Sequence, residues 1–216
     1  MTRPLTRRRN KLAPDPEMRR AILAAAAHVV REQGVRALSI AVVLDRAQLS
    51  TRAFYRHFQS KDQLVGAVFL DMARMEKRRL RRKMTRAADP VEAVAAWVDG
   101  RLDLAFDNNV RSDLRRLSLE AQSQMFASPE LIQPAYAEML EPLSEQLRRG
   151  LAHGVFVDID PVTDAEAVQA VVWAGTERQW STGQCDRAEV REQVLRFCLR
   201  GLGVAPETIH DVAGRG

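Results

Sequence analysis

The stretch SIAVVLDRAQLSTRAFYRHF, residues 39–58, contains two short helix-like segments. Ser39 precedes the apolar-periodic segment 40–47, and Ser50 precedes the segment 51–58. Serine is favoured at both places because its side-chain oxygen accepts a hydrogen bond from a backbone N–H at the start of a helix. Only Gln48 and Leu49 lie between the segments, so a tight turn must join them. The pattern predicts a helix-turn-helix.

The side chains of this motif divide into an inward and an outward set. The residues that can pack inward are Val43, Leu44, Ala47, Leu49, Phe54 and Phe58. The residues left on the remaining surface are Thr51, Arg52, Ala53, Tyr55, Arg56 and His57. A helix with such an outward set fits the major groove of DNA, where Arg reads guanine and the methyl of Ala or Thr meets that of thymine.

Helix signals continue on both sides of the motif. The run Asp15-Pro16-Glu17 starts a first helix that Gly34 can close. Ser60 and Gln63 form a capping box for a long fourth helix, which ends in the basic run 77–83. We interpret this basic run as a solvated helix face rather than as a second nucleic-acid site.

Start signals recur beyond residue 87 and predict helices over about 90–107, 111–126, 129–152, 163–182 and 187–202. Period-two alternation is confined to residues 154–160, a segment too isolated to build a sheet. The expected fold is therefore all-α, with about nine helices. We divide it into a basic mobile arm (1–15), a three-helix domain with the helix-turn-helix (16–62), a larger helical domain (63–205) and a tail (206–216).

Charge is distributed unevenly along the chain. Residues 1–62 hold 13 Lys and Arg against 5 Asp and Glu, a net of +8, and residues 63–86 hold 8 against 2, a net of +6. Residues 87–216 hold 12 against 21, a net of −9. A basic end joined to an acidic body indicates that one part of the molecule meets a polyanion.

Other classes of protein find little support in the composition. The longest apolar stretch, residues 21–30, is interrupted by His28, so we expect a soluble cytoplasmic protein without a membrane segment. The two cysteines, Cys185 and Cys198, have no metal-ligand spacing, so we expect neither a metal site nor a cofactor. The four histidines are scattered and no catalytic motif is present, which argues against an enzyme.

Residues 16–65 resemble the TetR family of transcriptional regulators. The resemblance rests on Gly34, Ser39, Val43, Ala47 and Ser50, followed by the runs 54–58 and 60–64, FYRHF and SKDQL. Two positions depart from the family pattern, because Leu44 stands where a small residue is common and Gln48 where glycine is common. Gln48 must therefore tolerate a backbone conformation that glycine adopts freely.

The resemblance implies a dimeric repressor that binds a palindromic DNA operator and is released by a small-molecule effector. It implies that Tyr55 and Lys61 hold phosphates, with further contacts from Ser39 and Ser50 at their helix starts. Thr51, Arg52, Ala53, Arg56 and His57 would face base edges or nearby phosphates. The alternatives are a buried ring for Tyr55 and a simple surface histidine for His57.

An effector domain needs a cavity, and cavities in helical bundles are lined by aromatic and Met side chains. The candidate ligand-binding residues are Phe69, Met72, Trp97, Phe106, Met125, Phe126, Tyr136, Met139 and Trp173. Ordinary core packing is the alternative for each of them. Pro134 and Pro142 either bend one long helix or mark two shorter ones. We expect an apolar or amphipathic effector, with cationic character favoured by the negative charge of residues 87–216.

The last two predicted helices carry apolar stripes that suit a homodimer interface. The stripes are Val168, Val171, Val172 and Gly175 in one helix and Val190, Val194, Phe197 and Cys198 in the next. Burial within the monomer is the alternative. An architectural DNA-binding protein without ligand control, and a helical adaptor that binds protein, are the competing functions.

Overall fold

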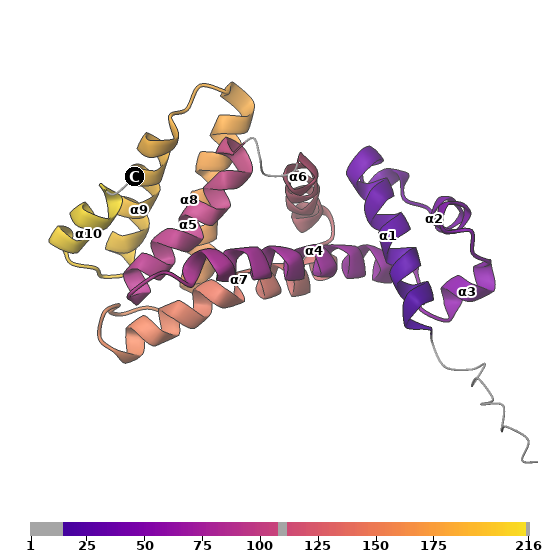
Figure 1. The fold of residues 1–216 in the computed structure, drawn as a ribbon, viewed down its shortest axis with the longest axis horizontal. Helices are drawn as coiled ribbons and strands as arrows, with labels where there is room; N and C mark the ends of the chain where they lie inside the picture. Colours follow the sequence, from indigo (N-terminus) through magenta and orange to yellow (C-terminus); the bar gives the residue numbers. More distant parts are fainter. Residues whose placement is uncertain (1–14, 108–111, 215–216) are drawn as a thin grey trace, which may run out of the picture. The chain divides into compact units, whose positions relative to one another are not determined.

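The computed structural model describes residues 15–107 and 112–214, and within these ranges it contains helices and no β-strand. The first five elements are α1 (Pro16–Gln33), the 3-10 helix η1 (Val35–Ala37), α2 (Ile40–Ala47), α3 (Thr51–Tyr55) and α4 (Lys61–Met84) (Figure 1). The remaining six are α5 (Pro90–Phe106), α6 (Ser112–Ala127), α7 (Pro129–Ala152), α8 (Thr163–Thr182), α9 (Arg187–Gly201) and α10 (Pro206–Ala213). The predicted all-α fold class is confirmed.

Two details differ from the sequence-based expectation. The described residues form ten α-helices rather than about nine, because α10 lies in the segment 206–216 that we expected to be a tail. Its Ile209 and Val212 are buried, so an apolar face holds this short helix in place. Helix α3 ends at Tyr55 instead of continuing to Phe58. Residues 1–14 of the predicted arm lie outside the described residues.

The chain divides into two compact units, Met1–Val68 and Phe69–Gly216, with the boundary inside α4. In the N-terminal unit, α1 contacts α2, and α2 contacts α3. Its core contains the fully buried rings of Phe54 and Phe58, whose centroids lie 5.7 Å apart. The guanidinium of Arg19 stacks over the Phe58 ring at 5.2 Å, which covers the edge of this small core.

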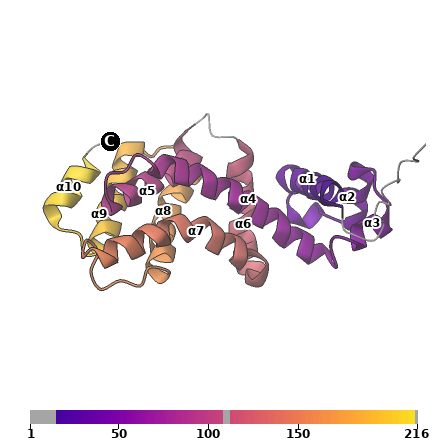
Figure 2. The same ribbon diagram turned by 60° about the horizontal axis from the view of Figure 1, so that its bottom comes forward.

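The C-terminal unit is built around α5, which contacts α7, α8 and α9. Because α5 has neighbours on several sides, it is buried almost all round, and Trp97 at its centre is completely inaccessible. Gly100 lets α4 approach α5 closely, since a Cβ at this position would lie 2.7 Å from the Leu80 side chain. Helix α10 packs against α9 and α5 (Figure 2).

Most of the helices expected from the sequence begin with a side-chain cap. Asp15, Ser39, Ser50, Asp89 and Asp186 each accept a backbone hydrogen bond at the start of their helix. The Ser128 side chain makes no capping bond at the start of α7. At α8 the cap is the carboxylate of Asp160, which accepts from the Thr163 N–H at 2.7 Å.

Helix α7 runs unbroken from Pro129 to Ala152 with Pro134 and Pro142 inside it, so the alternative of two shorter helices is wrong. Within the described ranges, no helix is both long and apolar enough to cross a membrane.

Candidate functional site

The turn of the helix-turn-helix is closed by Gln48 in the left-handed conformation, with φ 53° and ψ 45°. This is the backbone conformation that we expected Gln48 to adopt, because it stands where the family pattern commonly has glycine. The side chain compensates in part, because its Nε2 donates to the Asp45 carbonyl at 2.7 Å. The backbone N–H of Leu49 donates to the Leu44 carbonyl at 3.0 Å. The turn therefore keeps its geometry without a glycine.

An exposed polar surface follows the turn. Thr51, Arg52, Tyr55 and Arg56 are exposed. The Tyr55 side chain is 58% exposed and meets the Phe54 ring edge-on at 5.3 Å, so the alternative of a buried tyrosine is wrong. Within the described part of the chain, neither arginine, nor Lys61 at the start of α4, makes an ion pair. Their positive charges are therefore available to a polyanion.

Two residues of the predicted reading face are not exposed as expected. Ala53 is only 8% exposed, and it packs toward the core of the N-terminal unit. Both ring nitrogens of His57 are buried, and no described residue is in hydrogen-bonding position to them. The backbone stays close to helical here, since the Phe58 N–H still donates to the Phe54 carbonyl at 3.0 Å. The ring nitrogens of His57 are nevertheless buried, against the expectation from helical periodicity.

Ser39 and Ser50 are exposed at the two helix starts, where their hydroxyls cap the helices. Ser39 Oγ accepts from the Val42 N–H at 3.2 Å, and Ser50 Oγ accepts from the Ala53 N–H at 3.3 Å. Each hydroxyl keeps its own hydrogen for an outside acceptor. All nine proposed DNA-contacting residues thus lie in the N-terminal unit, and eight of them, all but Ala53, reach its surface at least in part.

The C-terminal unit contains a cavity of two adjoining lobes, each about 50 Å³ in volume. Both lobes are lined by Met72, Arg101, Tyr136 and Met139. We call this two-lobed space the effector cavity, after the role that the sequence suggested for its lining residues. Six predicted ligand-binding residues line it: Phe69, Met72, Met125, Tyr136, Met139 and Trp173.

Three predicted ligand-binding residues do not contribute to this lining. Trp97 packs in the core between α5 and its neighbours, and Phe106 lies partly buried against the same core. The side chain of Phe126 is outside the described residues. Aromatic character alone did not separate cavity residues from core residues, because both need apolar surface.

Sequence analysis missed the charged groups of the effector cavity, Glu76 and Arg101, which are each 5% exposed. Arg101 Nη1 donates to Glu76 Oε1 at 2.8 Å, and Arg79 Nε donates to Glu76 Oε2 at 2.8 Å. Burial raises the pKa of Glu76, but its hydrogen bonds and ion pairs with Arg79 and Arg101 outweigh this and hold the pKa below its ordinary value. No local signal marks these residues, since each resembles an ordinary charged position on an amphipathic helix.

The basic run 77–83 is largely exposed, as expected for a solvated face, and three of its residues also pair with acids on other helices. Lys77 Nζ lies 3.1 Å from Glu138 Oε1 on α7. Arg81 Nη2 lies 2.9 Å from Glu141 Oε2 on the same helix. Lys83 Nζ lies 2.6 Å from Asp103 Oδ2 on α5. These pairs stabilise the packing of α4 within the C-terminal unit.

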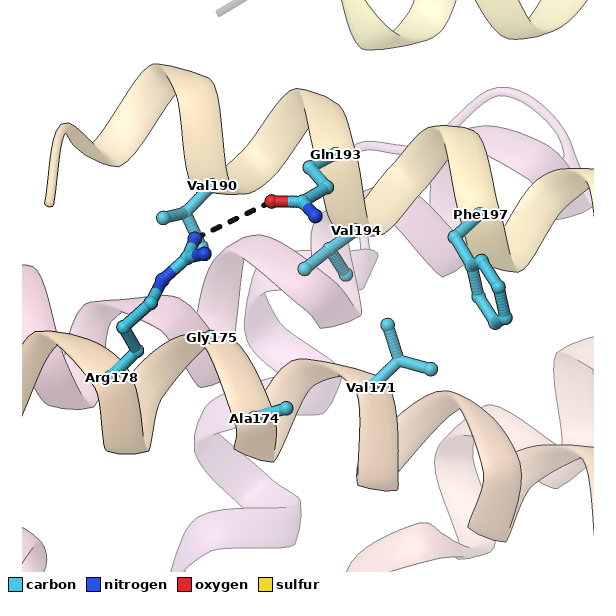
Figure 3. A pocket seen from close by; sticks show the side chains of 8 residues that line it. All are labelled: Val171, Ala174, Gly175, Arg178, Val190, Gln193, Val194 and Phe197. Carbon is cyan, nitrogen blue, oxygen red and sulfur yellow. Dashed lines mark hydrogen bonds between the residues drawn. The ribbon is translucent and has the colours of Figure 1, made fainter.

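The predicted dimer stripes on α8 and α9 are only partly available. Val168, Val172, Val190, Val194 and Cys198 are buried inside the unit. A groove of about 250 Å³ nevertheless runs between the two helices (Figure 3). Its exposed members are Ala174, Arg178, Gln193 and Phe197, and Phe197 is 67% exposed.

The groove is shallow at Gly175, where a Cβ would lie 2.8 Å from Val190 Cγ1. Above it, Arg178 Nη2 donates to Gln193 Oε1 at 3.4 Å across the two helices (Figure 3). The groove thus presents an apolar surface with a polar end, and Phe197 projects from α9 beside it (Figure 3).

Comparison with known proteins identifies the helix-turn-helix. Residues 22–68 match the family model described as bacterial regulatory proteins, tetR family. The HTH-type transcriptional repressor Rv3405c of Mycobacterium tuberculosis is 43% identical over 67 residues, which is 31% of this chain and 36% of that protein. The matching segment thus spans about a third of the length of this curated relative.

Solved structures extend the comparison to the rest of the fold. RolR without ligand has a TM-score of 0.64 and 21% identity, covering 91% of this chain and 97% of that chain. RolR in complex with resorcinol has a TM-score of 0.66 and 20% identity, covering 93% and 94%. At these low identities, the similarity between this chain and RolR concerns the fold alone.

The chain is therefore an all-helical protein with an N-terminal helix-turn-helix unit and a separate helical C-terminal unit. Residues 22–68 match the model of the tetR family of bacterial regulatory proteins, so the resemblance identified from the sequence is confirmed for the helix-turn-helix segment.

Proposed function

We propose that this protein is a dimeric transcriptional repressor that binds a palindromic operator and is released by a small molecule. The observation that carries the proposal is the exposed surface after the turn, where Arg52, Tyr55 and Arg56 carry no intramolecular ion pair among the described residues. Exposed cations beside two serine-capped helix starts suit a phosphate backbone and base edges together. The curated relatives are named HTH-type transcriptional regulators rather than enzymes.

Within this proposal, Tyr55 and Lys61 hold phosphates, and Ser39 and Ser50 add contacts at the helix starts. Thr51, Arg52 and Arg56 read base edges or neighbouring phosphates. Ala53 and His57 contribute less than the sequence suggested, because both are turned toward the core. Such a regulator works in the cytoplasm, where bacterial DNA lies.

Release requires a ligand that prefers a conformation with the wrong spacing of the two recognition helices. Half-sites lie about one DNA turn apart, roughly 34 to 36 Å, so a small change of spacing weakens binding to both at once. The effector cavity supports this part of the proposal, as does RolR, a protein of the same fold solved with resorcinol. Helix α4 is the proposed lever, because one continuous helix carries both Lys61 and the cavity residue Met72.

The dimer is proposed to form across the groove of α8 and α9, where two helices from each copy would make a four-helix interface. Phe197 supports this placement, since a large aromatic side chain that is mostly exposed in one copy gains most from being covered by another.

The test is selection of bound sequences from random duplex DNA with the purified full-length protein. The expected result is a palindromic motif with half-sites about ten base pairs apart, bound by two copies. An Arg52→Ala variant serves as control and should lose part of the motif. Binding without any enriched sequence would refute the proposal and favour the architectural alternative.

A further inference from the structure

The guanidinium of Arg101 has unused hydrogen-bond donors inside the effector cavity. Arg101 is 5% exposed and lines both lobes. Its Nη1 donates to Glu76 at 2.8 Å and its Nε to Gln169 Oε1 at 3.3 Å. The described structure holds no acceptor for its Nη2. This nitrogen is not completely shut off from solvent, so this edge of the guanidinium can donate to an acceptor that enters the cavity.

The Glu76 carboxylate cannot supply that acceptor, because Arg79 already occupies it from the other side. Glu76 Oε2 accepts from Arg79 Nε at 2.8 Å, and Oε1 accepts from both Arg79 Nη2 and Arg101 Nη1 at 2.8 Å. Arg79 is in turn shared with Asp103, whose Oδ2 lies 3.5 Å from its Nη1. Glu76 therefore neutralises only part of the charge of Arg101.

Positive charge exceeds negative charge along the whole chain of ion pairs that starts at the cavity. The connected carboxylates are Glu76, Asp99 and Asp103, and the connected cations are Arg79, Lys83, Arg101, Arg187 and Arg191. Three negative charges thus face five positive ones. Cations remain in excess even when the exposed Glu166, near Tyr136, is added.

Tyr136 lines both lobes together with Arg101. Burial raises the pKa of its phenol, the charge of Arg101 lowers it, and that of Glu166 raises it, with a net increase. The hydroxyl is therefore protonated at neutral pH and can donate a hydrogen bond. The lining also includes the apolar side chains of Phe69, Met72 and Trp173. The small lobes favour a compact molecule over a long lipid chain.

We propose that the effector cavity binds a small aromatic carboxylate, whose oxygens accept hydrogen bonds from Arg101 Nη2 and the Tyr136 hydroxyl while its ring lies against the apolar walls. This inference rests on the proposed function of the cavity as the effector site. The sequence favoured a cationic effector, because residues 87–216 carry a net charge of −9. The proposed effector is an anion instead, because that net charge does not describe the charged groups at the cavity. Glu76 competes with the ligand for Arg101 and so sets the affinity.

Three probes of nearly equal shape test the proposal: benzoate, benzamide and benzamidine, which are anionic, neutral and cationic. Their binding to the full-length protein is measured by titration calorimetry without DNA, at millimolar concentrations. Benzoate should bind at least about tenfold more tightly than benzamide, which is about 1.4 kcal/mol, and benzamidine should bind most weakly. Equal affinities, a preference for benzamidine, or no binding of benzoate would overturn the proposal.

Variants separate a ligand-binding role from a structural one. Glu76→Gln removes the competing charge, so it should tighten benzoate binding several-fold, a change that loss of structure would not produce. Arg101→Lys should weaken benzoate selectively, because lysine keeps the charge but lacks the planar fork. Gln122→Ala, which changes an uncharged residue of the lining, is the matched control and should leave the order of the probes unchanged. Unaltered or weaker binding by folded Glu76→Gln protein would also count against the proposal.

These outcomes are distinguishable from failure of the proposed function. Calorimetry reports on the cavity alone, whereas selection from random DNA reports on the N-terminal unit without any ligand. A protein with a clear operator and no preference for benzoate would keep the proposed function and lose this inference.

Discussion

Replacing Phe197 by serine should separate the proposed dimer while leaving the fold of each copy intact. Phe197 is 67% exposed, so its removal costs the monomer little packing. Two-thirds of a phenylalanine side chain corresponds to about 130 Å² of apolar surface. At about 25 cal/mol per Å², complete burial in an interface stabilises it by about 3 kcal/mol for each copy.

A twofold interface contains the residue twice, so the loss reaches about 6 kcal/mol when both rings are fully covered. The dissociation constant should then rise by up to about ten-thousandfold. Sedimentation velocity from nanomolar to micromolar concentration measures this shift directly. Affinity for a palindromic operator should fall in parallel, since both half-sites must be held at once.

Val157→Ser is the matched control, because Val157 is 58% exposed but lies in the loop between α7 and α8. It should sediment as the unaltered protein does. If Phe197→Ser protein remains dimeric at nanomolar concentration, or if the unaltered protein is monomeric at micromolar concentration, the assignment of the α8–α9 face is wrong.

Further predictions concern the DNA-contacting surface, the turn and the buried ion pairs. Arg52→Ala should relax base preference at one or two positions by about 1 to 3 kcal/mol, whereas Lys61→Ala should weaken all sequences about equally, as measured by competition binding. Gln48→Gly should raise the free energy of unfolding by about 0.5 to 1 kcal/mol in urea, because it relieves a left-handed backbone; a lower urea midpoint would contradict this. Since the pKa of Glu76 is depressed in the folded protein, its stabilising effect should be fully present above about pH 5 and be lost as the pH falls below about 4. Glu76→Gln protein should lose less stability over this range, and identical acid denaturation curves would refute the assignment.

The helix boundaries were predictable because their signals are local. The segments expected at 129–152 and 163–182 agree with α7 and α8, and the serine caps at Ser39 and Ser50 are where the sequence placed them. An N-cap depends on a side chain and a backbone N–H only a few residues away, so it can be recognised without knowledge of the tertiary structure.

The exposure of individual side chains was less predictable. His57 and Ala53 were expected on an exposed helix face, but Ala53 is buried within α3 and the ring nitrogens of His57 are buried just after it. The dimer stripes were likewise overestimated, because Val190 and Val194 pack within their own unit. An apolar stripe shows that a helix face must be covered, and it does not show by which neighbour.

The sequence by itself determined the all-helical class, which follows from periodicity and caps along the chain. It also determined the helix-turn-helix and its resemblance to the tetR family, because the motif is contained in about fifty contiguous residues. Only the tertiary structure decided the character of the effector cavity. Arg101 meets Glu76 and Gln169, which are 25 and 68 residues away in the chain, and such pairings leave no trace in local sequence patterns. The electrostatic character of a buried site depends on which few charges the fold brings within hydrogen-bonding distance, and those charges can differ in sign from the net charge of the segment that contains them.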